Sequence, residues 1–292
     1  MKTRRPNFRA VGRTSPPWAT RPRWFAGMAL AGLLMSSCGS SGVAQGSLPP
    51  TSTTTTSTTS TTIATAPAPG RPLTGMVVGI DPGHNGLNYS NVAFINHIVF
   101  NGRAMENCDT TGTATASRFS EAQFNFNVAM FLKVDLETEG ARVVLTRMTN
   151  SGVGPCIDRR AQILNSARVN VAIDIHADGG PTYGRGFAIL EPVADGPNNS
   201  VIASSVAFGV DVRTSFLAIT GMPLSTYDGV NGLKFRDDLA GLNLTTVPKV
   251  LIECGNMRNT TDAVMLMSTK FQRLAARGLA VAITNFLHQR QH

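Results

Sequence analysis

Two histidines and two glutamates stand where their side chains could do chemistry together: His84, Glu121, His176 and Glu253. The histidines and Glu253 occur at the ends of short apolar runs, VVGIDPGH, VNVAIDIHAD and PKVLIECGNM, whereas Glu121 opens a helix-like stretch. Two imidazoles and one carboxylate form the ligand set of many catalytic zinc sites, in which a fourth position stays open for water. A second carboxylate beside that water can act as its general base. The four residues therefore outline a zinc hydrolase.

Strand-like and helix-like segments alternate from Met76 onward. The apolar runs typical of buried strands are MVVGID, ARVVLTR, VNVAIDIH, GRGFAILEP and KVLIEC. Helical patterns occupy residues 120–140, 158–168, 199–219 and 261–288. This order predicts an α/β fold with a mostly parallel, twisted sheet and helices on both faces.

The predicted sheet brings the four residues together. Ligands of such sheets bind beyond the carboxyl ends of the strands. His84, His176 and Glu253 fall at those ends, and Glu121 falls in the first turn of a helix that Ser120 is suited to cap. We therefore expect an active site at the C-terminal ends of the strands.

Residues 85–118 interrupt the alternation with a long polar insertion that contains only short strand-like runs such as HIVF. A loop of this length in a compact domain is usually a functional lid or a mobile segment. Cys108 in this insertion and Cys156 in a later Gly-rich loop are the predicted disulfide pair, which an oxidising compartment permits. Cys254 ends an apolar strand and is expected to be a buried free thiol.

The net charge of +8 comes from the N-terminal part of the chain, because eight Lys and Arg precede Asp81 without any acid. In the rest of the chain the basic and acidic residues are equal in number, so its formal net charge is zero. This balance argues against nucleic acid as a partner. The basic region leads into WFAGMALAGLLMSSC, which is short for a membrane span and predicts an export segment over residues 1–46. Two outcomes are open for Cys38: it carries a lipid anchor, or it is discarded with a signal peptide cut near Ala44.

Residues 47–72 are rich in Ser, Thr and Pro and lack apolar residues that would offset the entropy of ordering. We predict a disordered linker there and a catalytic domain over residues 73–292. The chain is then expected in the periplasm or cell envelope, or secreted, with a membrane tether if Cys38 is lipidated.

In this order the motifs resemble those of the zinc-dependent N-acetylmuramoyl-L-alanine amidases of the amidase_3 type. The resemblance spans about residues 77–288 and rests on VVGIDPGHNG, Ser120-Glu121, DRRAQILNSARVNVAIDIHAD and VPKVLIECGNMRNTTDA. It implies that His84, Glu121 and His176 bind Zn²⁺ and that Glu253 is the catalytic glutamate. The cysteine pair and the ECGNM sequence are similar to those of mycobacterial secreted members. The insertion is longer than in compact members, and no wall-binding repeat is visible.

The resemblance implies a monomeric enzyme that cleaves the amide bond between N-acetylmuramic acid and L-alanine in peptidoglycan or its muropeptides. Two alternatives remain open: an inactive or regulatory cell-wall-binding homologue, and a different zinc hydrolase such as a peptidase or deacetylase. A serine hydrolase is disfavoured because the chain lacks a G-x-S-x-G elbow. Asp174, two residues before His176, either orients that histidine or makes ordinary structural bonds.

Overall fold

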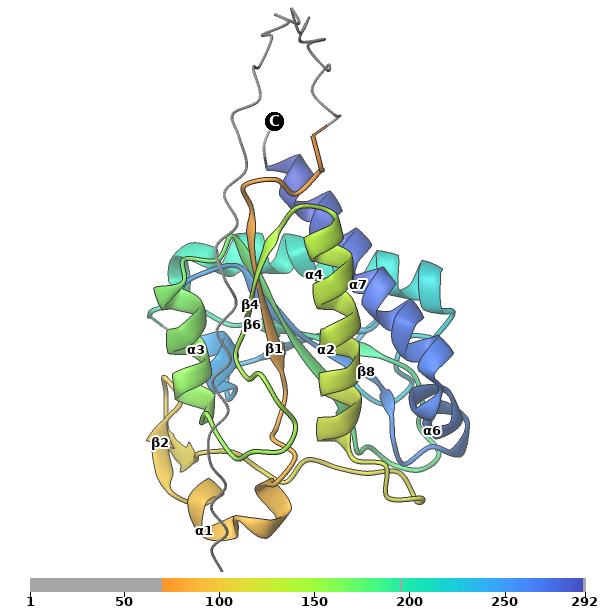
Figure 1. Ribbon diagram of the computed structural model, residues 1–292. Coiled ribbons are helices and arrows are strands. Elements are labelled where there is room, and N and C mark those ends of the chain that lie inside the picture. Colours follow the sequence, from red (N-terminus) through yellow and green to blue (C-terminus); the bar gives the residue numbers. More distant parts are fainter. Residues whose placement is uncertain (1–69, 195, 291–292) are drawn as a thin grey trace, which may run out of the picture. The chain divides into compact units, whose positions relative to one another are not determined.

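The structure is a computed structural model that describes residues 70–194 and 196–290 (Figure 1). The predicted export segment, Cys38 and nearly all of the predicted linker lie outside the described residues. The described part folds around a six-stranded sheet with the order β4-β1-β5-β8-β6-β7. Its strands are β1 (Val77–Pro82), β4 (Arg142–Leu145), β5 (Val171–Asp178), β6 (Ala188–Pro192), β7 (Leu233–Arg236) and β8 (Lys249–Asn256).

The sheet is mostly parallel, as predicted. Parallel pairing joins β1 to β4 and β5, β5 to β8, and β6 to β7, whereas β6 runs antiparallel to β8. The carboxyl ends of β1, β5 and β8 therefore meet at one edge. This edge carries the end of β1 and the residues His176 and Glu253 near the ends of β5 and β8.

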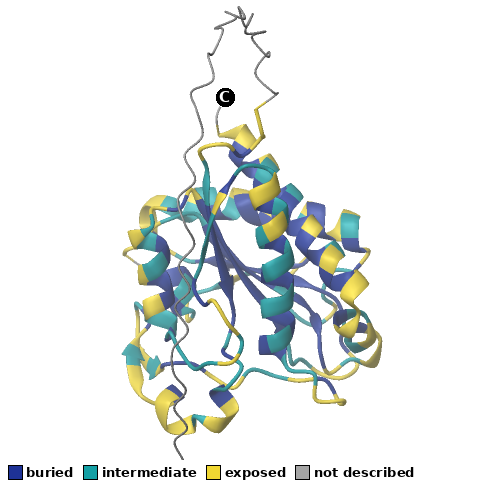
Figure 2. Ribbon diagram, viewed as in Figure 1, coloured by how far each residue is buried: buried dark blue, intermediate teal, exposed yellow. Residues whose placement is uncertain are grey.

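Helices cover both faces of the sheet (Figure 1). The larger core lies under α2 (Glu121–Thr138), α4 (Ile202–Thr220) and α7 (Thr269–Gln289). The opposite face is covered by α3 (Ile157–Ser166) and the short α5 (Ala240–Asn243). A short helix, α6 (Thr260–Met267), connects β8 to α7. Figure 2 shows the strands as a buried layer between partly exposed helices.

Alternation along the strands decides which side chains face the site. On β5, Ile173 and Ile175 enter the larger core, while Ala172 packs on the α3 side. Because successive side chains of a strand point to opposite faces, Asp174 and His176 share the α3 side with Ala172. The same alternation places Asp81 of β1 and Lys249 and Glu253 of β8 on that side.

The helix that carries Glu121 begins as its sequence predicts. Ser120 has an extended conformation, and its side chain accepts a hydrogen bond from the backbone N–H of Gln123. A capping serine satisfies one of the free N–H groups of the first turn and fixes where the helix starts. The start of α2 therefore sets the position of Glu121 relative to β1 and β5.

The segment Asn199–Thr220 is long and apolar enough to cross a membrane by composition. In the fold its helix α4 packs against β6 and α7, with Phe208, Val212 and Phe216 fully buried. A helix that packs on the core of a domain can pass the same compositional test, and α4 packs on the larger core through these side chains.

The insertion over residues 85–118 is ordered around short elements. It contains the short 3-10 helix Asn88–Ser90, α1 (Val92–Ile95) and an antiparallel hairpin of β2 (Ile98–Phe100) and β3 (Met105–Asn107). The predicted strand-like run HIVF becomes β2. The hairpin and α1 were not specified by the sequence pattern, because elements of three or four residues are too short to show a periodicity.

Candidate metal centre

The three predicted ligands converge at the edge of the sheet. The Oε1 atom of Glu121 lies 3.3 Å from Nε2 of His84 and 2.8 Å from Nδ1 of His176. One ligand atom from each residue falls within 4.8 Å of the other two. The side chains of the histidines are 12 % and 15 % exposed, so only a small part of each ring reaches the surface. The arrangement offers two nitrogens and one carboxylate oxygen to a single ion.

Gly83 makes the approach of the two imidazoles possible. A Cβ atom at this position would lie 2.1 Å from Nε2 of His176, which no side chain could tolerate. His84 itself has φ of 57°, in the left-handed region that non-glycine residues rarely adopt. The Asp-Pro-Gly-His turn therefore directs His84 across the end of β5.

Glu121 is held from two sides. Its Oε2 accepts a hydrogen bond from the backbone N–H of Thr113 at 2.9 Å, and its own N–H donates to the carbonyl of Thr113. Its Oε1 accepts from the N–H of Ala177 at 3.4 Å. These contacts tie the start of α2 to both the insertion and β5.

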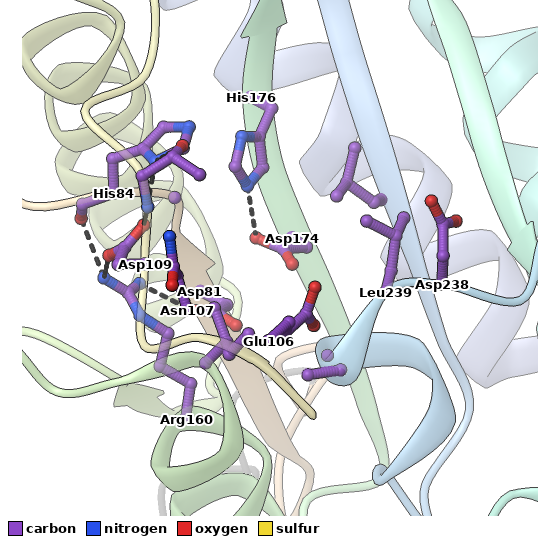
Figure 3. Close-up of a pocket in the computed structure, with 16 residues that line it drawn as sticks. Asp81, His84, Glu106, Asn107, Asp109, Arg160, Asp174, His176, Asp238 and Leu239 are labelled. Atoms are coloured by element: carbon purple, nitrogen blue, oxygen red, sulfur yellow. Dashed lines mark hydrogen bonds and ion pairs between the residues drawn. The ribbon is translucent and has the colours of Figure 1, made fainter. Parts of the chain in front are cut away.

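Each histidine also contacts a second carboxylate through its other ring nitrogen. Nδ1 of His84 lies 3.0 Å from Oδ1 of Asp109, and Nε2 of His176 lies 3.3 Å from Oδ1 of Asp174 (Figure 3). Asp174 also lies 3.5 Å from Nζ of Lys249. It therefore contacts His176 and also makes a structural ion pair, the two alternatives that the sequence left open. Asp109 was not singled out from the sequence.

A buried network of charges lies beneath the histidines. Asp81 accepts hydrogen bonds from Arg160, Lys249 and Thr146, at distances of 2.8, 2.8 and 2.6 Å. Burial alone would raise the pKa of Asp81, but Lys249 and Arg160 outweigh it and lower that pKa below its ordinary value. Arg160 also donates to the backbone carbonyl of His84 at 2.8 Å. The network fixes the backbone that carries the first histidine.

The surroundings of the histidines stabilise positive charge. Burial alone would lower the pKa of His84, but the charge of Glu121 and the hydrogen bond to Asp109 raise it to about 9. Burial of His176 is likewise outweighed by Asp174 and Glu121, which raise its pKa well above the ordinary value. A place that attracts protons this strongly is also suited to a metal cation, which would replace them.

Glu253 lies beside this cluster. The parallel register of β5 and β8 pairs His176 with Glu253 directly. Its Oε2 is buried and has no hydrogen-bond partner within the part of the chain that the structure describes. Burial, reinforced by the nearby Glu121 and Asp178, raises the pKa of Glu253 to about 8. A buried carboxylate with a free oxygen and a perturbed pKa is suited to proton transfer.

A cavity of about 380 Å³ borders the two histidines on the α3 side (Figure 3). Its walls come from the ends of β1 and β5, from Glu106 and Asn107 of the hairpin, and from residues 238–241. The insertion therefore contributes directly to the space next to the candidate metal ligands.

A disulfide joins Cys108 to Cys156, with their Cα atoms 4.7 Å apart. It connects the insertion to the start of α3, where Cys156 occupies the N-cap position. Cys254 is buried and is the free cysteine among residues 70–194 and 196–290, as its place in β8 predicts.

Comparisons with known proteins identify the family that the chain resembles. A family model described as N-acetylmuramoyl-L-alanine amidase matches residues 78–285. An N-acetylmuramoyl-L-alanine amidase of Mycobacterium tuberculosis is 39% identical over 227 residues, which cover 77% of this chain and 92% of that protein.

Solved structures give the same result. The N-acetylmuramyl-L-alanine amidase Ami1 from Mycobacterium smegmatis matches with a TM-score of 0.70 and 38% identity, covering 74% of this chain and 99% of that one. The apo form of Ami1 from Mycobacterium abscessus matches with a TM-score of 0.69 and 39% identity, covering 73% of this chain and 99% of that one.

Proposed function

The chain belongs to the N-acetylmuramoyl-L-alanine amidase family, and from this premise we propose that it hydrolyses peptidoglycan with the help of a bound zinc ion. The bond cleaved is the amide between the lactyl group of N-acetylmuramic acid and the L-alanine of the stem peptide. The observation that carries the proposal is the convergence of His84, Glu121 and His176 within 4.8 Å of one another.

The donor set supports zinc as the metal. Two imidazole nitrogens with one carboxylate oxygen are typical of catalytic zinc sites, which leave a position open for water and substrate. The close approach of the two imidazoles depends on Gly83, and each imidazole is held at its other nitrogen by an aspartate. Zinc, when bound there, acts as a Lewis acid that polarises the scissile carbonyl and makes a water molecule more acidic.

Glu253 is the proposed general base and general acid. It accepts a proton from the attacking water as the C–O bond forms, and it delivers that proton to the alanine nitrogen as the C–N bond breaks. Two observations support this role: Glu253 lies beside His176, and its Oε2 has no hydrogen-bond partner among residues 70–194 and 196–290. A dication held by the neighbouring ligands would favour the charged form of Glu253, against the effect of burial.

The cellular setting follows from the substrate. We propose that the chain is exported to the cell envelope by residues 1–46 and that residues 47–72 separate the enzyme from its attachment point. Mass analysis of the mature N-terminus distinguishes a lipid on Cys38 from cleavage near Ala44. We also propose that the enzyme works as a monomer, which light scattering of the purified protein tests.

The deciding experiment is mass spectrometry of purified muropeptides before and after incubation with the enzyme and zinc. The proposal requires separation of intact stem peptides from N-acetylmuramic acid. Loss of acetyl groups identifies a deacetylase, and cleavage within the stem identifies a peptidase. Zinc binding without any product identifies an inactive or regulatory homologue. Glu253→Gln is the matched control, because it changes one carboxylate to an amide of the same shape.

A further inference from the structure

We propose that Asp109 is a positioning residue that holds His84 in its metal-binding orientation, and that the Cys108–Cys156 disulfide holds Asp109 in place. The inference rests on the proposed function, because it concerns how a zinc ligand is held in its binding orientation before zinc binds. It goes beyond that function by assigning a role to two features that the reaction itself does not use.

The contact between Asp109 and His84 has the geometry of an orienting hydrogen bond. Oδ1 of Asp109 lies 3.0 Å from Nδ1 of His84, and Asp109 is 5 % exposed. In the neutral imidazole that a metal requires, Nδ1–H donates to this carboxylate and the other nitrogen, Nε2, carries no proton. That nitrogen is the one that lies 3.3 Å from Oε1 of Glu121. The hydrogen bond therefore selects both the ring rotation and the tautomer that a metal requires.

The carboxylate of Asp109 is itself fixed by several donors. Its Oδ1 accepts from the N–H of Thr110 at 2.7 Å, and its Oδ2 accepts from Nδ2 of Asn85 at 2.9 Å. Oδ2 also lies 3.8 Å from Nη2 of Arg160. With these partners in place, Asp109 has little freedom to rotate, so the orientation is set before any metal binds.

The disulfide brings Asp109 to His84. Cys108 directly precedes Asp109, and its carbonyl accepts from the N–H of Ile157 at 3.0 Å. Cys156 starts α3, whose Arg160 donates to the carbonyl of His84. The sulfur bridge thus joins the segment that contacts the His84 side chain to the helix that contacts its backbone.

Asp174 makes a similar contact with His176 but is a poorer probe. Its carboxylate also neutralises the buried Lys249, at 3.5 Å. Replacing Asp174 would leave that charge with fewer partners and destabilise the sheet for a separate reason. Asp109 contacts Arg160 only at 3.8 Å, and Arg160 keeps its closer bond to Asp81 at 2.8 Å. Replacing Asp109 therefore leaves the buried ion pair of Arg160 with Asp81 in place, which makes it the better probe of the contact with His84.

The test is the zinc dissociation constant of the purified protein, measured by competition with a chromogenic chelator. Asp109→Asn is expected to raise that constant about 10- to 100-fold, the usual effect of removing a carboxylate behind a metal-binding histidine. Asp237→Asn is the matched control, because this substitution makes the same chemical change at a side chain that is 61 % exposed. Excess zinc should restore turnover to Asp109→Asn, which would not follow from damage to the fold.

Equal zinc affinities of Asp109→Asn and Asp237→Asn overturn the positioning role. The proposed function is tested separately, because it requires that the unaltered protein bind zinc and that His84→Ala abolish this binding. Nitrogen NMR of histidine-labelled, zinc-loaded wild-type protein needs no variant. A proton on Nδ1 of His84 supports the proposal, and a proton on Nε2 overturns it.

The role of the disulfide is tested with Cys108→Ser combined with Cys156→Ser. Both a lower melting temperature and weaker zinc binding are expected. A lower melting temperature with unchanged zinc affinity removes the disulfide from the proposal and leaves it as a stabilising crosslink.

Discussion

His176 and Glu253 are direct neighbours in the parallel register of β5 and β8. Their side chains point to the same face of the sheet, on which Ala172 and Leu251 contact α3 and α5. The pairing places the imidazole of a proposed metal ligand next to a carboxylate whose Oε2 lacks a hydrogen-bond partner in the described part of the chain. The two residues are therefore expected to have different roles: His176 binds the metal, and Glu253 transfers protons.

Glu253→Gln tests this difference in roles. The amide keeps the shape of the side chain but cannot accept the proton of the attacking water. We expect turnover of muropeptides to fall by roughly 10²–10⁴-fold, while zinc content and melting temperature stay near those of the wild type. Loss of zinc from Glu253→Gln would instead identify Glu253 as a ligand.

His84→Ala and His176→Ala test the ligand set. Each removes one of three donors, so we expect metal analysis to fall from about one zinc per chain towards zero, together with activity. His288→Ala is the matched control, because His288 is exposed and contacts only the backbone of Pro72 among the described contacts. Full zinc occupancy in either variant would exclude that histidine from the site.

The convergence of these residues could be predicted because each sits at a position that the fold defines by a simple rule. His84, His176 and Glu253 occur at the carboxyl ends of apolar strands, and parallel strands bring such ends to one edge. Glu121 follows a serine that fixes the start of a helix. The strand ends and the helix start follow from local sequence patterns, whereas the metal-ligand role of Glu121 is implied by the resemblance to the amidase family.

Asp109 and the charge network beneath the site could not be predicted in this way. Asp109 lies in an irregular loop, where no periodicity relates side-chain direction to sequence. Lys249 contacts Asp81 across a separation of 168 residues, and it looks like an ordinary polar residue before an apolar strand. Such pairs emerge only once the strand order is known, because the contact depends on β1 and β8 flanking β5.

The disulfide should affect both stability and substrate choice. It links residues 48 apart, for which the chain-entropy estimate is about 4 kcal/mol of stability, less any strain. It also anchors the insertion, whose Glu106 and Asn107 line the cavity beside the histidines. We expect the double serine variant to melt at a lower temperature and to cleave polymeric peptidoglycan better relative to muropeptides. A lower melting temperature with an unchanged substrate ratio would argue against a role in selection.

The boundary of the catalytic domain can be tested by truncation. Leu73 is fully buried, and its N–H donates to the carbonyl of Glu139 at 2.9 Å. A chain that begins at Gly70 should therefore keep the stability of the domain and its activity on soluble muropeptides. A chain that begins at Thr74 should lose about 1.5–3 kcal/mol of unfolding free energy, the usual contribution of a buried leucine. Chemical denaturation compares the two, and loss of activity in the longer chain would place essential residues before Gly70.

Glu191 should make stability depend on pH. Glu191 lies on β6 and is 1 % exposed. Its carboxylate packs against Gly209 of α4 so closely that a Cβ atom added at Gly209 would lie 2.3 Å from Oε1 of Glu191. Within the described residues that Oε1 has no hydrogen-bond partner, and burial raises the pKa of Glu191 from 4.5 to about 7. Between these two values the unfolded chain has released the proton that the folded protein still holds. The free energy of unfolding should therefore fall as pH rises from about 4.5 to about 7, by up to about 3 kcal/mol.

Glu191→Gln removes this titration. The unfolding free energy of the variant minus that of the wild type should therefore increase across the same pH window and stay constant at higher pH. Urea unfolding at about pH 5 and about pH 8 measures the difference, in which groups that titrate in both proteins cancel. Glu137→Gln is the control, since the Glu137 side chain is 43 % exposed and pairs with Lys133 on the surface of α2. If the curves for Glu191→Gln and the wild type run parallel, Glu191 is not the buried acid that β6 and α4 enclose.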